Sequence, residues 1–157
     1  MYTLRHDRMV TYNKIYDLIS THRPISLSSS TIALVAKTRS FIEKAVANRE
    51  VIYGVTTGFG AFKNTLVSAR DTLQLQKNLI ISHAVGVGRP FEEIIVRTMM
   101  FLFINSLSKG YSGVRPIIIQ TLVAMLNKGV IPIIPEKGSV GSSGDLAPSA
   151  HLVLVLI

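Results

Sequence analysis

The sequence predicts a mainly α-helical protein, with a small mixed α/β portion near Tyr53 and the start of a helical bundle after Asp145. Three observations favour this class. Apolar residues recur at helical spacing in several long segments, side chains that cap helices precede some of them, and glycine-rich turns separate them. At 157 residues and 48% hydrophobic composition, the chain can bury one sizeable core, so a single domain over residues 1–157 is expected.

The first two helices are expected from serine caps followed by periodic apolar residues. Serines at positions 28–30 supply capping oxygens before residues 31–48, where apolar side chains recur at roughly helical spacing. Ser68 opens a capping box whose fourth position holds Asp instead of Glu or Gln, and helical periodicity then continues to about His83. These signals predict two of the long helices.

Two further helices are bounded by glycine. A periodic segment over residues 91–109 ends at Gly110, and another over residues 114–128 ends at Gly129. Pro116 is compatible with the second of these because it falls in the first turn, where a backbone N–H is not needed.

The segments between the helices are rich in glycine or proline. Residues 51–53 form a short extended run before a glycine-rich turn at residues 54–60, and a second such turn covers residues 86–90. Residues 130–135 are predicted to be extended, and the apolar residues 151–157 look like the first turns of another helix.

The charge of the chain raises nucleic-acid binding as a hypothesis. The formal net charge is +8, from 17 Lys and Arg against 9 Asp and Glu. However, the basic residues are scattered singly and have no interleaved aromatic residues that would stack on bases. A solvated basic face without a nucleic-acid partner is therefore predicted.

Membrane, secreted and metal-binding classes are also disfavoured. The most apolar run, residues 94–104, contains Arg97 and is too short to span a bilayer. Residues 1–8 lack the apolar core of a signal peptide, and the chain has no cysteine for disulfides or thiolate metal sites. We expect a cytoplasmic protein without a membrane partner or metal, whose apolar surface is covered by a partner or by further chain.

Residues 138–151 hold the most informative motif, Gly-Ser-Val-Gly-Ser-Ser-Gly-Asp-Leu-Ala-Pro-Ser-Ala-His. Composition alone indicates a flexible loop, followed by a helix that Asp145 caps and that holds Pro148 in its first turn. A phosphate-binding loop is disfavoured because no Gly-Lys-Ser or Gly-Lys-Thr follows.

The order of these residues resembles the signature of the histidine, phenylalanine and tyrosine ammonia-lyases and the related aminomutases. Other segments resemble three further blocks of that family in the same order: a mobile tyrosine loop, a substrate-selectivity segment and a helix-turn-helix block. These are residues 53–60, residues 75–79 with 82–88, and residues 105–107 with 110–115. The resemblance covers about residues 53–151.

The resemblance implies that Ser142, Ser143 and Gly144 cyclise to a methylidene-imidazolone (MIO) group. The amide nitrogen of Gly144 would attack the carbonyl carbon of Ser142, which requires a compressed turn without a side chain on Gly144. Loss of water from that carbonyl and from the Ser143 side chain would leave an alkene conjugated to the ring. The family commonly has alanine where this chain has Ser142, but that side chain is not consumed.

The resemblance also implies roles for residues outside this motif. Tyr53 corresponds to an acid–base tyrosine, although a tyrosine after two β-branched residues is more often a core residue. Gly60, Ser82 and His83 are expected to contact the substrate. Ser82-His83 is similar to the pair in histidine-specific members and indicates L-histidine, whereas a lone helical histidine is more often a partly buried structural residue.

The implied reaction is the non-oxidative elimination of ammonia from L-histidine, which gives trans-urocanate in histidine degradation without a diffusible cofactor. Family members are longer and homotetrameric, so the expected partners are the remainder of the polypeptide and identical subunits, and this chain alone is expected to be inactive. The alternatives are a phenylalanine or tyrosine ammonia-lyase, an aminomutase, or an inactive fragment that serves as an assembly module.

Four other residues fall in the matching blocks. Structural roles are at least as well supported as functional ones for Asn78, Arg115 and His151. Asp145 is expected either to cap the following helix or to assist the cyclisation.

Overall fold

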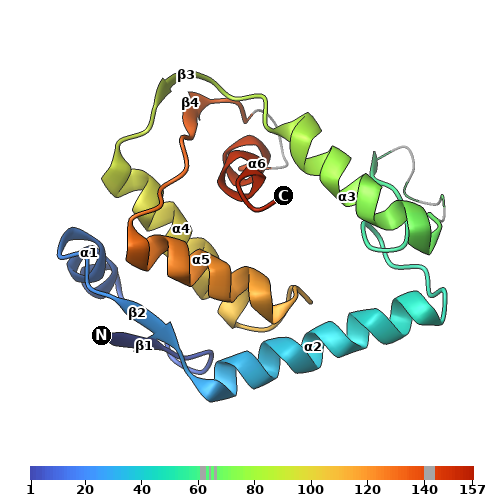
Figure 1. The fold of residues 1–157 in the computed structure, drawn as a ribbon, viewed down its shortest axis with the longest axis horizontal. Helices are drawn as coiled ribbons and strands as arrows, with labels where there is room; N and C mark the ends of the chain where they lie inside the picture. The colour runs from blue at the N-terminus through green and yellow to red at the C-terminus, as the bar shows by residue number, and fades with distance from the viewer. Residues whose placement is uncertain (61–62, 64, 66, 140–143) are drawn as a thin grey trace. The chain divides into compact units, whose positions relative to one another are not determined.

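The computed structural model describes residues 1–60, 63, 65, 67–139 and 144–157. The helices of this part are α1 (Tyr12–Ser20), α2 (Ser29–Ala47), α3 (Ala69–His83), α4 (Glu93–Ser108), α5 (Pro116–Lys128) and α6 (Leu146–Leu154), drawn in Figure 1. The strands are β1 (Tyr2–Leu4), β2 (Ile25–Leu27), β3 (Val87–Pro90) and β4 (Pro135–Lys137). They form a parallel β1–β2 pair and a β3–β4 pair. Because the helices are long and the strands are short, the prediction of a mainly α-helical fold is confirmed.

The capping and glycine signals set the helix ends as predicted. The Ser68 Oγ accepts a hydrogen bond from the Asp71 N–H at 3.2 Å and begins α3. Pro116 is the first residue of α5, and Gly129 ends that helix with φ of 70°. Left-handed backbone of this kind is open to glycine at little cost, which explains why glycine ends the helix.

The extended run expected at residues 51–53 is wrong. These residues form no strand and lead into a turn, in which the Thr56 hydroxyl accepts from the Ile52 N–H at 2.8 Å and donates to the Glu50 carbonyl at 2.6 Å. The threonine side chain thus pairs backbone groups that a neighbouring strand would otherwise pair. The β structure lies instead in the pairs β1–β2 and β3–β4.

The chain divides into two compact units, and the expectation of one domain over residues 1–157 stays a prediction. The first unit comprises Met1–Ser40 and Arg89–Ile134. In it, α4 packs against α5 and α1, and β2 packs against α5. The side chains buried most completely in this unit are Leu4, Leu18, Met100, Phe101, Ile104, Ile119 and Leu122.

Asn127 joins the first strand pair to α5. Its Nδ2 donates to the Ile25 carbonyl at 2.8 Å, and its Oδ1 accepts from the Ile25 N–H at 2.9 Å. One side chain therefore pairs both backbone groups of a buried residue at the start of β2. Unpaired backbone groups at such a position would cost about 1–3 kcal/mol each.

Arg97, the charged residue within the most apolar run, is buried at 4% exposure. Its Nη2 donates to the Leu126 carbonyl in the last turn of α5 at 3.5 Å, and its Nη1 lies 3.7 Å from Glu93 Oε1. A cation near a helix C-terminus is favourable because the helix dipole is negative there. Arg97 therefore links α4 to the end of α5.

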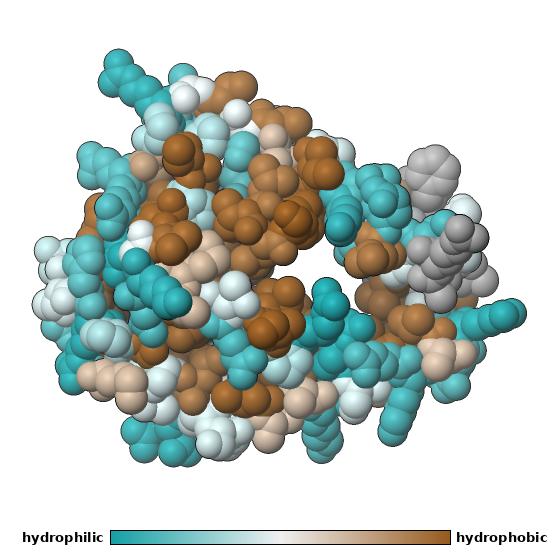
Figure 2. Space-filling model, in the orientation of Figure 1, coloured by the Kyte–Doolittle hydropathy of each residue, from teal (hydrophilic) through white to brown (hydrophobic). Residues whose placement is uncertain are grey.

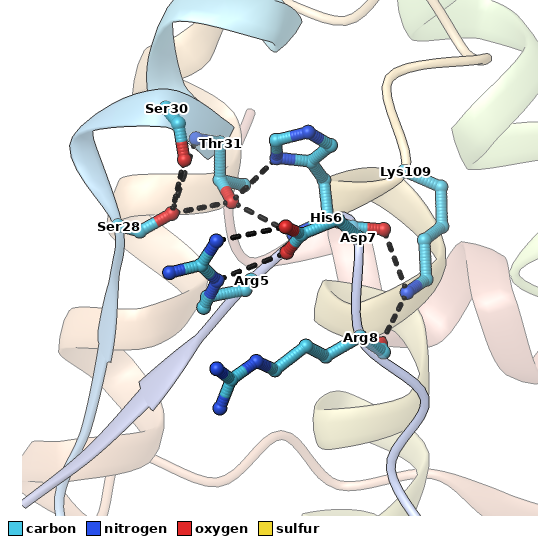
Figure 3. A network of polar contacts seen from close by, with 8 residues as sticks. All are labelled: Arg5, His6, Asp7, Arg8, Ser28, Ser30, Thr31 and Lys109. Atoms are coloured by element: carbon cyan, nitrogen blue, oxygen red, sulfur yellow. Dashed lines mark hydrogen bonds and ion pairs between the residues drawn. The ribbon is translucent and has the colours of Figure 1, made fainter.

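Lys109 fixes the segment that follows β1 (Figure 3). Its Nζ donates to the carbonyl oxygens of His6 at 3.0 Å and Arg8 at 2.8 Å. The His6 N–H donates in turn to the Thr31 hydroxyl at 3.0 Å. This segment is consequently held at the end of α4 and at the start of α2.

An exposed ion pair lies beside these contacts (Figure 3). Arg5 donates from Nε to Asp7 Oδ1 at 3.0 Å and from Nη2 to Asp7 Oδ2 at 2.8 Å. This two-point hydrogen bonding to the guanidinium holds the pKa of the Asp7 carboxyl well below its ordinary value. The pair is solvent-exposed, so its contribution to stability is small.

The second unit comprises Phe41–Gly88 and Pro135–Ile157. Its main packing contact is between α3 and α6 (Figure 1). Figure 2 shows apolar side chains gathered over α6, where Leu146, Val155 and Ile157 in and beside the helix are exposed. Nowhere in the described part of the chain does a helix combine the length and the apolar character needed to cross a membrane.

Candidate functional site

The turn that carries Tyr53 is held together by local contacts. The Tyr53 and Phe59 rings meet edge to face, with centroids 5.7 Å apart, and the Gly60 N–H donates to the Tyr53 hydroxyl oxygen at 3.4 Å. Gly54 has φ of 70°, and a Cβ placed on it would lie 2.7 Å from Phe59 Cε1. The turn therefore requires glycine at position 54, both for its backbone and for the aromatic ring beside it.

The Tyr53 turn is attached to α3. Gln76 in that helix donates from Nε2 to the Gly54 carbonyl at 3.0 Å. A cavity of about 350 Å³ lies beside the turn, and its lining residues are Gly58, Phe59, Thr65, Val67, Leu75, Asn78, Leu79 and Ser82. This role of Gln76 was not predicted, although a polar residue within the apolar stripe of a helix is a usable signal.

The last turn of α3 fixes the protonation pattern of His83. Its Nδ1 lies 2.8 Å from the Leu79 carbonyl oxygen. Because a carbonyl can only accept, Nδ1 donates its N–H, and in the neutral form of the ring this leaves Nε2 as an acceptor. Ser82 donates its hydroxyl to the same carbonyl at 2.9 Å, and its Oγ lies 3.1 Å from Nδ1. The end of α3 thus offers a hydrogen-bond acceptor of defined orientation.

A second cavity brings the predicted selectivity residues together with the signature motif. It has a volume of about 180 Å³, and its lining residues are Ser82, His83, Val85, Gly138, Ser139, Gly144, Leu146 and Ala147. Ser82 lines both cavities, so they meet at the end of α3. Of the other predicted site residues that the structure describes, Tyr53 and Gly60 do not line the cavity that holds Gly144.

The motif itself is described only in part. The predicted cofactor-forming residues Ser142 and Ser143 lie outside the described residues. Gly144 has φ of 68°, and among the described residues beyond its chain neighbours no atom lies within 4 Å of the position that a Cβ would take. Within the described ranges, no three His, Asp or Glu side chains lie close enough together to hold a metal ion.

Asp145 does not form the expected side-chain cap. It occupies the position before α6, but its side chain makes no hydrogen bond to the backbone of the first turn. Its ψ is 42°, whereas a capping residue normally has extended backbone that directs its oxygen at those N–H groups. The exposed Asp145 carboxylate is therefore not used as a helix cap.

The family of the chain follows from its match to a protein-family model. The model of the aromatic amino acid lyases matches residues 10–157, which is nearly the whole chain. The chain belongs to the aromatic amino acid lyase family. A protein named histidine ammonia-lyase from Alkaliphilus metalliredigens (strain QYMF) is 56% identical over 133 residues, 85% of this chain.

Solved structures of this lyase family share its fold. Phenylalanine aminomutase from Pantoea agglomerans matches 99% of the chain with a TM-score of 0.91 and 35% identity. Histidine ammonia-lyase from Trypanosoma cruzi matches 98% with a TM-score of 0.85 and 35% identity. The chain spans only 26% of the Alkaliphilus metalliredigens protein and about 30% of these two structures.

Three small residues of the chain allow close packing at the wall of the second cavity. A Cβ on Gly138 would lie 2.9 Å from the Ala147 Cβ and 3.0 Å from the Gly86 Cα. The start of the motif, the turn after α3 and the first turn of α6 therefore meet at van der Waals distance. No role was predicted for Gly138 by itself, and the small residue that it contacts on α6 is identified only by the structure.

Proposed function

We propose that the complete protein to which this chain belongs is a histidine ammonia-lyase, which converts L-histidine to trans-urocanate and ammonia. The observation that carries the proposal is that Ser82 and His83 line one cavity with Gly144. Relatives named histidine ammonia-lyase, 44–56% identical over most of this chain, support the choice of substrate. The protein would act in histidine degradation, in the cytoplasm and as a homotetramer.

Ser142, Ser143 and Gly144 would form the MIO group. The backbone at Gly144 supports this: its left-handed φ is a conformation that glycine adopts at little cost, which suits a residue whose backbone nitrogen must enter a five-membered ring. Once formed, the group supplies an electrophile that makes the amino group of the substrate able to leave.

The described residues supply binding and proton transfer. The Nε2 acceptor of His83 would take the N–H of the substrate imidazole and so favour histidine over phenylalanine, which has no ring N–H to donate. Tyr53 would act in acid–base chemistry, because the Gly60 N–H binds its oxygen and leaves the hydroxyl proton free for exchange. Gly60 and Ser82 would complete the substrate contacts.

A substrate panel tests the choice of L-histidine. In the complete protein, His83→Leu is expected to lower kcat/KM for L-histidine by about 10- to 100-fold, the effect of a lost hydrogen bond to a polar ring. Values for L-phenylalanine and L-tyrosine should not fall in parallel. An equal loss on all three amino acids would refute the selectivity role of His83.

A pair of serine variants tests the MIO assignment. Ser143→Ala removes the side chain that must lose water and is expected to abolish activity with the fold intact. Ser142→Ala is the matched control, since the side chain at that position is not consumed, and it should keep activity. Full activity of Ser143→Ala would refute the assignment.

A second candidate follows from the structural comparison. The phenylalanine aminomutase of Pantoea agglomerans is as similar in sequence as the solved histidine ammonia-lyase. A phenylalanine- or tyrosine-specific lyase or aminomutase would show its preferred substrate in the same panel. A protein without turnover of any of these amino acids would instead be an assembly module.

A further inference from the structure

His151 makes a hydrogen bond that fixes which of its ring nitrogens is the acceptor. It lies in α6, and its Nε2 is 2.9 Å from the Gly86 backbone nitrogen. A backbone N–H can only donate, so Nε2 must present a lone pair, and the proton of the neutral ring lies on Nδ1. A helical histidine that merely fills space needs no such acceptor.

The turn that His151 contacts is built to admit the ring. A Cβ on Gly86 would lie 2.9 Å from His151 Nε2 and 3.1 Å from the Pro135 Cβ. A side chain at position 86 would therefore displace the imidazole or the start of β4. On its other side, Gly86 lies against Gly138, whose own Cβ would come within 3.0 Å of the Gly86 Cα.

This turn directly follows the residues that line the cavity. Ser82 and His83 are in the last turn of α3, and Gly86 is three residues beyond His83. The same cavity is also lined by Gly144 and by the first turn of α6. The hydrogen bond from Gly86 to His151 therefore connects the turn after α3 to α6, the two elements that flank the cavity, and His151 is not among the described residues that line it.

We propose that His151 is a positioning residue, which through its bond to the Gly86 N–H holds the Ser82-His83 end of α3 beside the Gly144 segment. The proposal rests on the proposed function of that segment. Packing alone would hold the turn in contact with α6, whereas an acceptor at a fixed point also sets the position of the turn along the helix. His151 acts through Gly86 and His83 and does not itself contact the substrate.

Two variants of the complete protein distinguish the effect of the hydrogen-bond acceptor on His151 from the effect of the size of that side chain. His151→Leu keeps an apolar side chain of similar size and removes the acceptor, and His151→Gln places an amide oxygen near the position of Nε2. Three readouts apply to each: hydrogen exchange of the Gly86 amide, the mass of the peptide that holds residues 142–144, and kcat and KM for L-histidine.

His151→Leu is expected to speed exchange at Gly86 by about tenfold, as for one lost hydrogen bond, and to lower kcat by about tenfold or more. His151→Gln should restore both to within about threefold of wild type, which a purely space-filling residue would not require. If His151→Leu does not fold, His151→Met takes its place as the variant without a comparable acceptor.

Two results would overturn the proposal. One is unchanged exchange at Gly86 and unchanged kcat in His151→Leu, and the other is His151→Gln as impaired as His151→Leu. A wild-type peptide that has lost two waters, together with either result, would refute only the role of His151. A wild-type peptide at its full coded mass would instead refute the proposed function and the proposal that rests on it.

Discussion

Gly138→Ala tests the close packing at the wall of the second cavity. The added Cβ would lie 2.9 Å from the Ala147 Cβ and 3.0 Å from the Gly86 Cα. Neither neighbour is the flexible end of a long side chain, so the loop or the first turn of α6 must shift. Overpacking of this kind costs about 1–3 kcal/mol, and we expect the free energy of unfolding to fall by that amount.

The assay is urea denaturation of four proteins: wild type, Gly138→Ala, Ala147→Gly and the double variant. Ala147→Gly alone is expected to cost about 0.5–1 kcal/mol, because glycine is a weaker helix former than alanine. In the double variant the contact with the Ala147 Cβ is removed, so the decrease in the free energy of unfolding should be smaller than the sum of the decreases in the two single variants. Additivity within about 0.5 kcal/mol, or a Gly138→Ala protein as stable as wild type, would refute the packing argument.

Three further perturbations follow from contacts in the two units. Asn127→Leu leaves two backbone groups of β2 unpaired and should lower the free energy of unfolding by about 2 kcal/mol or more. A loss below about 0.5 kcal/mol would contradict the role given to the two hydrogen bonds between Asn127 and Ile25. Gly54→Ala meets Phe59 at 2.7 Å and should destabilise more than Gly129→Ala, which has a similar φ and open space, when both are measured by thermal unfolding. Because the pKa of Asp7 is lowered in the folded protein, its pair stabilises above the ordinary carboxyl range and is lost as pH falls through the lowered pKa. Asp7→Asn should therefore lower the unfolding temperature slightly at neutral pH and leave it unchanged at the acid end of a pH series.

Most of the helices were predictable because their signals are local, but α1 was not predicted, although the Thr11 side chain caps it in the same way. Ser68 and Gly129 set the ends of α3 and α5 through their own backbone neighbours, and the apolar period is readable between such ends. The pair β1–β2 was not predicted, since three-residue strands carry little periodicity and depend on partners far along the chain. Asn127 lies 102 residues beyond the strand residue that it binds.

The segment of residues 51–53, which leads into a turn, shows why local propensity failed near the site. Two β-branched residues favour a strand there, but the Thr56 hydroxyl forms hydrogen bonds with backbone groups that would otherwise pair with a neighbouring strand. The closeness of His83 to Gly144 was expected only from the family resemblance. The tautomer of His83 depends on the Leu79 carbonyl and was accessible only from the structure.

The most direct test of the central claim is the mass of the peptide that contains residues 142–144, isolated by proteolysis from the complete protein of its native source. The account predicts a peptide lighter than its coded mass by two water molecules, with the loss confined to Ser142, Ser143 and Gly144. A peptide at its full coded mass, from a protein shown to be folded, would contradict the assignment of this segment as the origin of the electrophile.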